Sequence, residues 1–199
     1  MKRGKNNKKL PLRKPDNRNV SYSGPSVLKG LILYRKICKL HLCKHLVIMK
    51  YTSEIIIDRP REEVINKLDN AENMQHWQRG LIKYEFTHGT PGEEGAQMAL
   101  EYQMGKRNMV LTETIIKNNF PSEFHANYDA KGVHNIQRNF FHEINANSTK
   151  WVSETEFQFS GFGMKLMGFL MPGVFKKQSM KYLVDFKNFV ENGDSVKDS

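Results

Sequence analysis

Acid–base chemistry needs an ionisable side chain inside an apolar site, and predicted strands of this chain carry three candidates, Glu113, Tyr102 and Tyr128. If Leu111 and Ile115 face the interior, the alternation of a strand carries Glu113 inward with them. Burial would then raise the pKa of this carboxyl and suit it to a general acid or base role. The opposite register places Glu113 in solvent, because a shift of one residue exchanges the two faces of a strand.

Further polar side chains lie on a later predicted strand, and the pattern leaves their orientation open. One face of this strand carries Asn135, Gln137 and Asn139, which could orient a ligand carbonyl. The other face carries His134, Ile136, Arg138 and Phe140. The alternation therefore does not decide which of the two sets faces the interior.

The common catalytic and metal-binding motifs are missing from the sequence. It contains no H-E-x-x-H, G-x-S-x-G, P-loop or G-x-G-x-x-G pattern. Both cysteines, Cys38 and Cys43, lie close to His41 and His45, but the spacing C-x2-H-x-C-x-H is too cramped for a structural zinc site. We therefore expect no metal and no cofactor, and binding is favoured over catalysis.

Charge divides the chain into two unlike segments. Residues 1–48 carry 13 Lys or Arg and one acidic residue, a net charge of +12, whereas residues 49–199 carry 18 basic and 20 acidic residues, a net charge of −2. The basic pI therefore describes the first segment, and it gives no reason to expect nucleic-acid binding by the second. We expect a basic, largely disordered tail over 1–48 and one domain over 49–199.

Three interpretations of this tail compete. In the favoured one, Met49 is the true start and residues 1–48 are upstream sequence translated from a misplaced start. The alternatives are a basic helix on an anionic membrane surface and a nucleic-acid arm. The apolar run 26–48 is too interrupted by Lys and Arg to span a membrane and starts too late for a signal peptide. A cytoplasmic location is therefore expected, while the oligomeric state stays open.

The elements that must position the candidate residues begin at a strand ending with three isoleucines, residues 55–57. Asp58 is expected to cap the helix that follows, and Val64, Ile65 and Leu68 supply its buried stripe. Six more strands are predicted, at residues 81–87, 96–104, 109–117, 122–129, 133–144 and 149–160.

The last strand and the C-terminal segment predict how the sheet is covered. One face of the last strand carries Trp151, Ser153, Thr155, Phe157 and Phe159, and the other face is mostly charged. Helices must therefore cover the apolar face. Two are predicted, over 162–171 and 174–190, separated by Pro172-Gly173. The second helix has an apolar stripe that includes Phe175, Ser179, Tyr182, Phe186 and Phe189, widened by Met180, Leu183, Val184 and Val190.

Residues 49–199 resemble the START-like, or SRPBCC, superfamily, and are most similar to bacterial polyketide cyclase/dehydrase and lipid transport proteins. The resemblance rests on residues 55–77, G-V-x-N at 132–135, T-x-W at 149–151 and M-P-G-x-F-K-K-Q-S at 171–179. It implies the α+β helix-grip fold. In this fold a curved antiparallel sheet of about six to seven strands wraps around a long C-terminal helix, with two small helices after the first strand.

The resemblance also implies a deep apolar pocket between sheet and helix for an apolar small molecule such as a lipid or polyketide. We expect its lining to comprise Trp77, Tyr102, Tyr128, Trp151, Phe157, Phe159, Met164, Met167, Met171, Phe175, Ser179 and Tyr182. A non-catalytic carrier or sensor is the favoured function. A cyclase or dehydratase that uses Glu113 or Tyr128 is the alternative, and a partner-binding module is a further one.

Overall fold

The described part of the chain folds as a strand, three short helical elements, six further strands and a long final helix. The computed structural model describes residues 47–161 and 172–197, which fall within the unit His45–Ser199. The strands are β1 Val47–Ile57, β2 Leu81–His88, β3 Gln97–Met104, β4 Arg107–Asn119, β5 Glu123–Ala130, β6 Val133–Asn145 and β7 Ser148–Phe159. The helices are α2 Arg61–Leu68, the 3-10 turn η1 Ala71–Asn73, α3 Met74–Trp77 and α5 Pro172–Asn192.

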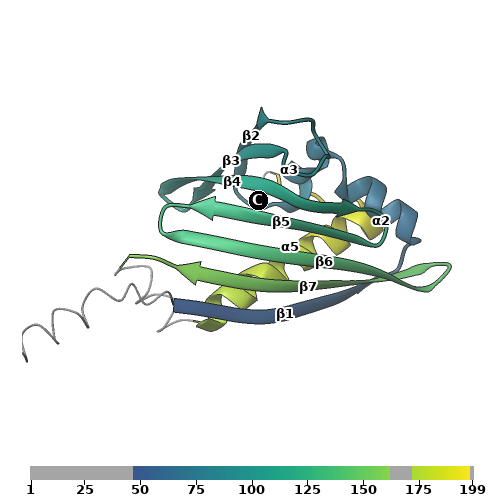
Figure 1. Ribbon diagram of the computed structural model, residues 1–199. Helices are drawn as coiled ribbons and strands as arrows, with labels where there is room; N and C mark the ends of the chain where they lie inside the picture. Colours follow the sequence, from purple (N-terminus) through teal and green to yellow (C-terminus); the bar gives the residue numbers. More distant parts are fainter. Residues whose placement is uncertain (1–46, 162–171, 198–199) are drawn as a thin grey trace, which may run out of the picture. The chain divides into compact units, whose positions relative to one another are not determined.

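All seven strands form one antiparallel sheet in the order β1-β7-β6-β5-β4-β3-β2. Helix α5 lies across one face of this sheet, and α2 and α3 lie near its C-terminal end (Figure 1). We call the face toward α5 the inner face. The α+β helix-grip architecture predicted from the sequence is confirmed. The predicted helix over 162–171 lies outside the described residues, and no helix within them is long and apolar enough to cross a membrane.

The first strand begins slightly earlier than the sequence predicts. It starts at Val47, two residues before Met49, and Val47 pairs with Phe159 at the end of β7. The pairing continues without a register shift to Ile57, which lies opposite Thr149. Strand β1 is thus an edge strand whose whole length is bonded to β7.

The N-terminus of α2 is not capped by the residue that the sequence predicts. Asp58 does not cap the helix, because Pro60 occupies the N-cap position and no side chain caps there. The Asp58 carboxylate instead accepts a hydrogen bond from Ser148 Oγ (3.1 Å), and its backbone N–H donates to the Glu191 carboxylate at the end of α5 (2.6 Å). Asp58 therefore joins the sheet to the final helix.

The predicted alternation of β7 is confirmed, because Trp151, Ser153, Thr155 and Phe159 are buried while Glu154 is exposed. Residues directly opposite each other in an antiparallel sheet share a face. The inner face defined on β7 can therefore be followed strand by strand through the pairing register.

Helix α5 is held to the inner face by an aromatic cluster. The Phe186 ring meets Trp77 and Trp151 edge to face, with centroid separations of 5.2 and 5.3 Å, and Phe186 is fully buried. Beside it, the Arg79 guanidinium donates two hydrogen bonds to the Asp185 carboxylate (2.7 and 3.1 Å). Val184 was predicted to widen the apolar stripe of α5, but it is 39% exposed because its side of the helix faces away from the sheet.

Truncating Phe186 tests whether this cluster anchors α5. Phe186→Ala removes a fully buried ring between two tryptophans, so we expect it to lower the free energy of unfolding by about 3–5 kcal/mol. Val184→Ala, two residues earlier on the exposed side of α5, is the control and should change it by less than about 0.5 kcal/mol. Urea unfolding followed by tryptophan fluorescence measures both. Equal effects of the two substitutions would contradict the assignment.

Candidate functional site

A row of side chains crosses the inner face and brings the predicted acid–base candidates together. Tyr128 lies directly opposite Glu113 on β4 and opposite Asn135 on β6. The row continues to Phe157 on β7 and to Met98 on β3. We call these five residues the cross-sheet row. Side chains at such opposed positions are about 4.5–5.5 Å apart at Cβ, so the carboxyl, phenol and amide are neighbours.

The register question for Glu113 is thereby answered. Leu111 and Ile115 share its face, as the inward register requires, and Glu113 is 9% exposed. Burial raises the pKa of Glu113 above its ordinary value, while the hydrogen bond from the Tyr128 hydroxyl lowers it by a smaller amount. The result is a carboxyl that holds its proton more tightly than one in water, as a general acid or base in an apolar site does.

Tyr128 and Tyr102 lie near this carboxyl with protonated hydroxyls, and Tyr182 of α5 lies near Tyr102. Burial raises the pKa of Tyr128 well above its ordinary value, and the charge and hydrogen bond of Glu113 raise it further. Burial likewise raises the pKa of Tyr102 well above its ordinary value, with added contributions from Tyr182 of α5 and from Glu113. The Tyr102 hydroxyl donates to Gln78 Oε1. The site thus holds phenolic donors rather than phenolates.

Two asparagines of β6 point inward but differ in whether their side-chain oxygens have hydrogen-bond partners. Asn139 Oδ1 accepts a hydrogen bond from Trp151 Nε1 (3.0 Å), which fixes both side chains in the core. Asn135 Oδ1 is buried and, within the part of the chain that the structure describes, has no hydrogen-bond partner. A buried acceptor without a partner costs about 1–3 kcal/mol, so Asn135 is a site at which a ligand donor would be stabilising.

The inner face of β2, β3 and β4 keeps large apolar side chains in contact with solvent. Phe86 lies opposite Met98, and Met109 lies opposite Tyr102, so both belong to the inner face. Their exposed fractions are 47% for Phe86 and 38% for Met109, with 44% for Met104 at the end of β3. The β1, β7 and β6 half of the same face packs against α5 instead. The inner face therefore has a packed half and a partly open apolar half.

The predicted lining residues fall into two groups. Trp77 and Trp151 belong to the packed core around Phe186, and Phe157 and Phe159 pack on Phe175 with centroid separations of 5.1 and 5.2 Å. Ser179 contacts the Tyr51 hydroxyl (2.8 Å). Tyr102 and Tyr128 lie near Glu113, and Tyr182 lies near Tyr102. Met164, Met167 and Met171 lie outside the described residues.

Some inner-face residues were missed at the sequence level. Tyr51, Phe86 and Met98 face inward with the candidate residues, and strict alternation from Ile57 and Leu100 would have indicated Tyr51 and Met98. Phe86 was harder to place because register shifts flank it, one between Leu81 and Lys83 and one after Phe86. Gln78 follows a short helix and carried no periodic signal.

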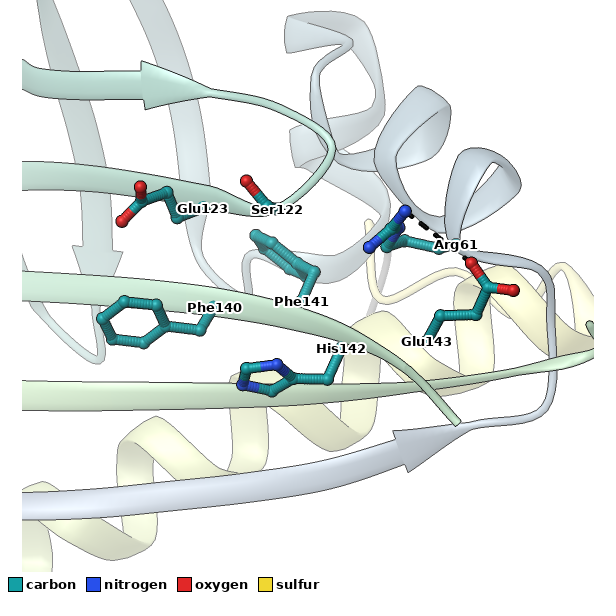
Figure 2. A pocket seen from close by; sticks show the side chains of 7 residues that line it. All are labelled: Arg61, Ser122, Glu123, Phe140, Phe141, His142 and Glu143. Carbon is teal, nitrogen blue, oxygen red and sulfur yellow. Dashed lines mark ion pairs between the residues drawn. The ribbon is translucent and has the colours of Figure 1, made fainter. Parts of the chain in front are cut away.

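Two surface depressions lie near the ends of the strands. The larger, about 420 Å³, lies between the start of α2 and the ends of β5 and β6, where Arg61 reaches Glu143 (3.7 Å) beside Phe140 and Phe141 (Figure 2). The smaller, about 320 Å³, lies beside Tyr102 and α5, lined by Arg79, Gly80, Gln103, Met104, Gly105, Gln178 and Lys181. The second reaches the inner face at Met104, near the end of β3, and neither depression is lined by a residue of the cross-sheet row.

Comparison with solved structures places this fold among known proteins. Norcoclaurine synthase from Thalictrum flavum is similar with a TM-score of 0.59 at 12% identity, over 74% of this chain and 96% of that one. The Zhui aromatase/cyclase from Streptomyces sp. R1128 is similar with a TM-score of 0.56 at 11% identity, over 75% and 100%. An uncharacterised protein from Rhizobium leguminosarum is similar with a TM-score of 0.55 at 11% identity, over 73% and 97%.

These neighbours confirm the predicted helix-grip fold, and identities this low establish the fold alone. No protein-family model matches the sequence. No curated protein matches it either.

Replacing Glu113 tests its burial through the pH dependence of stability. Between its ordinary pKa of 4.5 and the raised folded value, the native protein keeps a proton that the unfolded chain releases, so wild-type stability falls as pH rises through this window. Glutamine does not ionise. Glu113→Gln should therefore gain stability relative to wild type as pH rises through the window, and keep that gain above it.

Urea unfolding of both proteins from pH 4 to pH 8 measures this difference. Glu85→Gln is the control, because a hydrogen bond and charge from Lys83 lower the pKa of Glu85, so its removal costs stability at the higher pH instead. A difference between Glu113→Gln and wild type that stays constant with pH would show that the carboxyl is not buried.

Proposed function

We propose that this domain binds a small molecule with a mainly apolar body between the inner face of the sheet and α5. The observation that carries the proposal is the partly open half of the inner face. There, Phe86 remains exposed opposite Met98, at the end of the cross-sheet row, and Met109 remains exposed opposite Tyr102 on the same face as Glu113. Large apolar side chains next to a few convergent polar groups are typical of small-molecule sites.

The energetics require such a ligand to reach the buried row. Completing the burial of Phe86, Met104 and Met109 would contribute roughly 1 kcal/mol each, or about 3 kcal/mol together. Micromolar affinity requires about 8 kcal/mol. The remainder must come from the ligand's own apolar surface and from polar contacts with the cross-sheet row, so a ligand that stays at the edge of the sheet would bind too weakly.

The fold neighbours support a small-molecule role. One structure of norcoclaurine synthase is described as a complex with dopamine and hydroxybenzaldehyde, and its TM-score to this chain is 0.57. For this chain we favour a carrier or sensor of a lipid- or polyketide-like molecule. The site offers one carboxyl with protonated phenols, which suffices to orient a ligand.

An acid–base enzyme of the cyclase or dehydratase type is the second candidate function. The specific observation in its favour is the contact of Glu113 with Tyr128, because burial raises the pKa of both groups in one apolar site. A carboxyl with a raised pKa can protonate or deprotonate a bound ligand near neutral pH. In this function the phenol of Tyr128 would hold Glu113 in place or stabilise developing negative charge.

A charge placed on the open half of the inner face should prevent ligand binding. Met109→Asp puts a carboxylate beside Tyr102, and we expect it to lower the affinity for the neutral apolar dye Nile red at least tenfold. Val110→Asp, the next residue on the outer face, is the matched control and should bind the dye as wild type does. Fluorescence titration of the full chain measures both. Equal affinities for the two variants would contradict the proposed site.

The two candidate functions can be distinguished once a ligand has been identified. The full chain is purified from cells and extracted with organic solvent, and the bound molecule is identified by mass spectrometry. If the protein is an enzyme, Glu113→Gln should keep the affinity for this molecule and lower turnover by about 10²–10⁴-fold. A carrier should release the molecule unchanged, with no conversion by wild type or by Tyr128→Phe.

A further inference from the structure

We infer that the ligand of this site presents an uncharged hydrogen-bond donor, an alcohol or phenol hydroxyl, to Asn135, and that the site discriminates against carboxylates. The inference rests on the proposed function and specifies the chemistry of its ligand. It is carried by two observations on the inner face, the unpartnered Asn135 Oδ1 and the distribution of charge around it.

The described strands place no cation at the centre of the inner face, and Lys181 of α5, which lines the smaller depression, is exposed. Among the inner-face positions of the described strands, Glu113 is the ionisable group at the centre of the sheet. Arg107 and Glu143 lie at the ends of their strands and are exposed, and Glu143 pairs with Arg61 (3.7 Å). The Arg79 guanidinium is bonded to Asp185 on the side facing α5.

A carboxylate bound at the row would therefore lie next to Glu113 without a cation opposite it. If Glu113 is ionised, the two negative charges repel each other. If Glu113 is neutral, the ligand's charge is buried without compensation, which costs several kcal/mol. Both protonation states of Glu113 disfavour a fatty-acid carboxylate, so the discrimination does not depend on which state prevails.

A ligand hydroxyl can bind at the row without the cost of burying a charge. The Tyr128 hydroxyl already donates to Glu113, so the free acceptor of the row is Asn135 Oδ1 on the neighbouring strand. A ligand hydroxyl can donate to this oxygen, which removes the cost of a buried acceptor without bringing in a charge. Phe157 on the other side of Asn135 supplies an apolar wall for the adjoining carbons.

A protonated amine could also donate to Asn135, and it is the strongest competing ligand. It would bind well only beside an ionised Glu113. Desolvation is the largest influence on this carboxyl and opposes its charged form. Binding an ammonium would therefore require the desolvation of two charges, a cost that the attraction between them often does not recover, so the hydroxyl is preferred.

Three ligands with the same ten-carbon chain test the inference, namely 1-decanol, decanoate and decylammonium. Each competes with Nile red for the full-length protein at pH 7. The Met109→Asp variant, whose site is blocked, corrects for binding elsewhere, including to the 13 basic residues of segment 1–48. We expect decanol to displace the dye with at least tenfold higher affinity than decanoate or decylammonium.

The Asn135→Leu variant tests whether Asn135 causes the preference for decanol. Because Asn135 Oδ1 has no partner within the described residues, an apolar side chain of similar size should preserve the fold. The variant should bind decanol about tenfold more weakly and leave the affinity for decanoate unchanged. The wild-type comparison decides the charge preference by itself, so the inference stays testable whether or not this variant folds.

The outcomes separate the inference from the function on which it rests. Displacement of the dye by decanoate or decylammonium as strong as that by decanol overturns the inference but leaves the proposed function in place. Nile red that binds wild type no better than Met109→Asp, with no effect of any competitor, overturns the proposed function itself. An Asn135→Leu variant that folds and keeps the full affinity for decanol shows that another acceptor holds the hydroxyl.

Discussion

The packing of Phe186 between Trp77 and Trp151 is the interaction on which the rest of this structure depends. These three rings come from α5, α3 and β7, and they fix the C-terminal end of the final helix against the inner face. The pair of Arg79 and Asp185 lies beside them and sets the rotation of α5. With the helix fixed in this way, Tyr182, one turn before Phe186, is brought toward Tyr102.

Because α5 is anchored in this way, the two halves of the inner face differ in how far they are covered. The half of the sheet formed by β1, β7 and β6 is covered by aromatic side chains and α5, and it supplies stability. The half formed by β2, β3 and β4 keeps Phe86 and Met109 partly exposed. This half also contributes core residues, because Met98, Leu100 and Tyr102 of β3 are buried. Substitutions at its exposed positions, Phe86 and Met109, can therefore change binding without removing the core.

The buried polar row lies where these two halves meet. A polar group in an apolar interior is costly unless it is hydrogen-bonded. Tyr128 and Glu113 form a hydrogen bond with each other. The side-chain oxygen of Asn139 accepts a hydrogen bond from Trp151, whereas that of Asn135 has no partner within the described residues. The difference between two asparagines four residues apart on one strand is the physical basis for assigning one to the core and the other to a ligand.

The sequence by itself determined the order of elements and the faces of the regular strands. Alternation on β7 predicted its inner face correctly, because period-two burial is a local property of the chain, and the isoleucines of β1 predicted that strand. Whether Glu113 faces inward could not be determined, since a strand with apolar residues on both faces has two acceptable registers. Pairing with β5 decided it by placing Tyr128 opposite. Likewise, the roles of Asp58, Trp77 and Asn135 depend on α5 and on neighbouring strands far away in the sequence, which only the tertiary structure brings into contact.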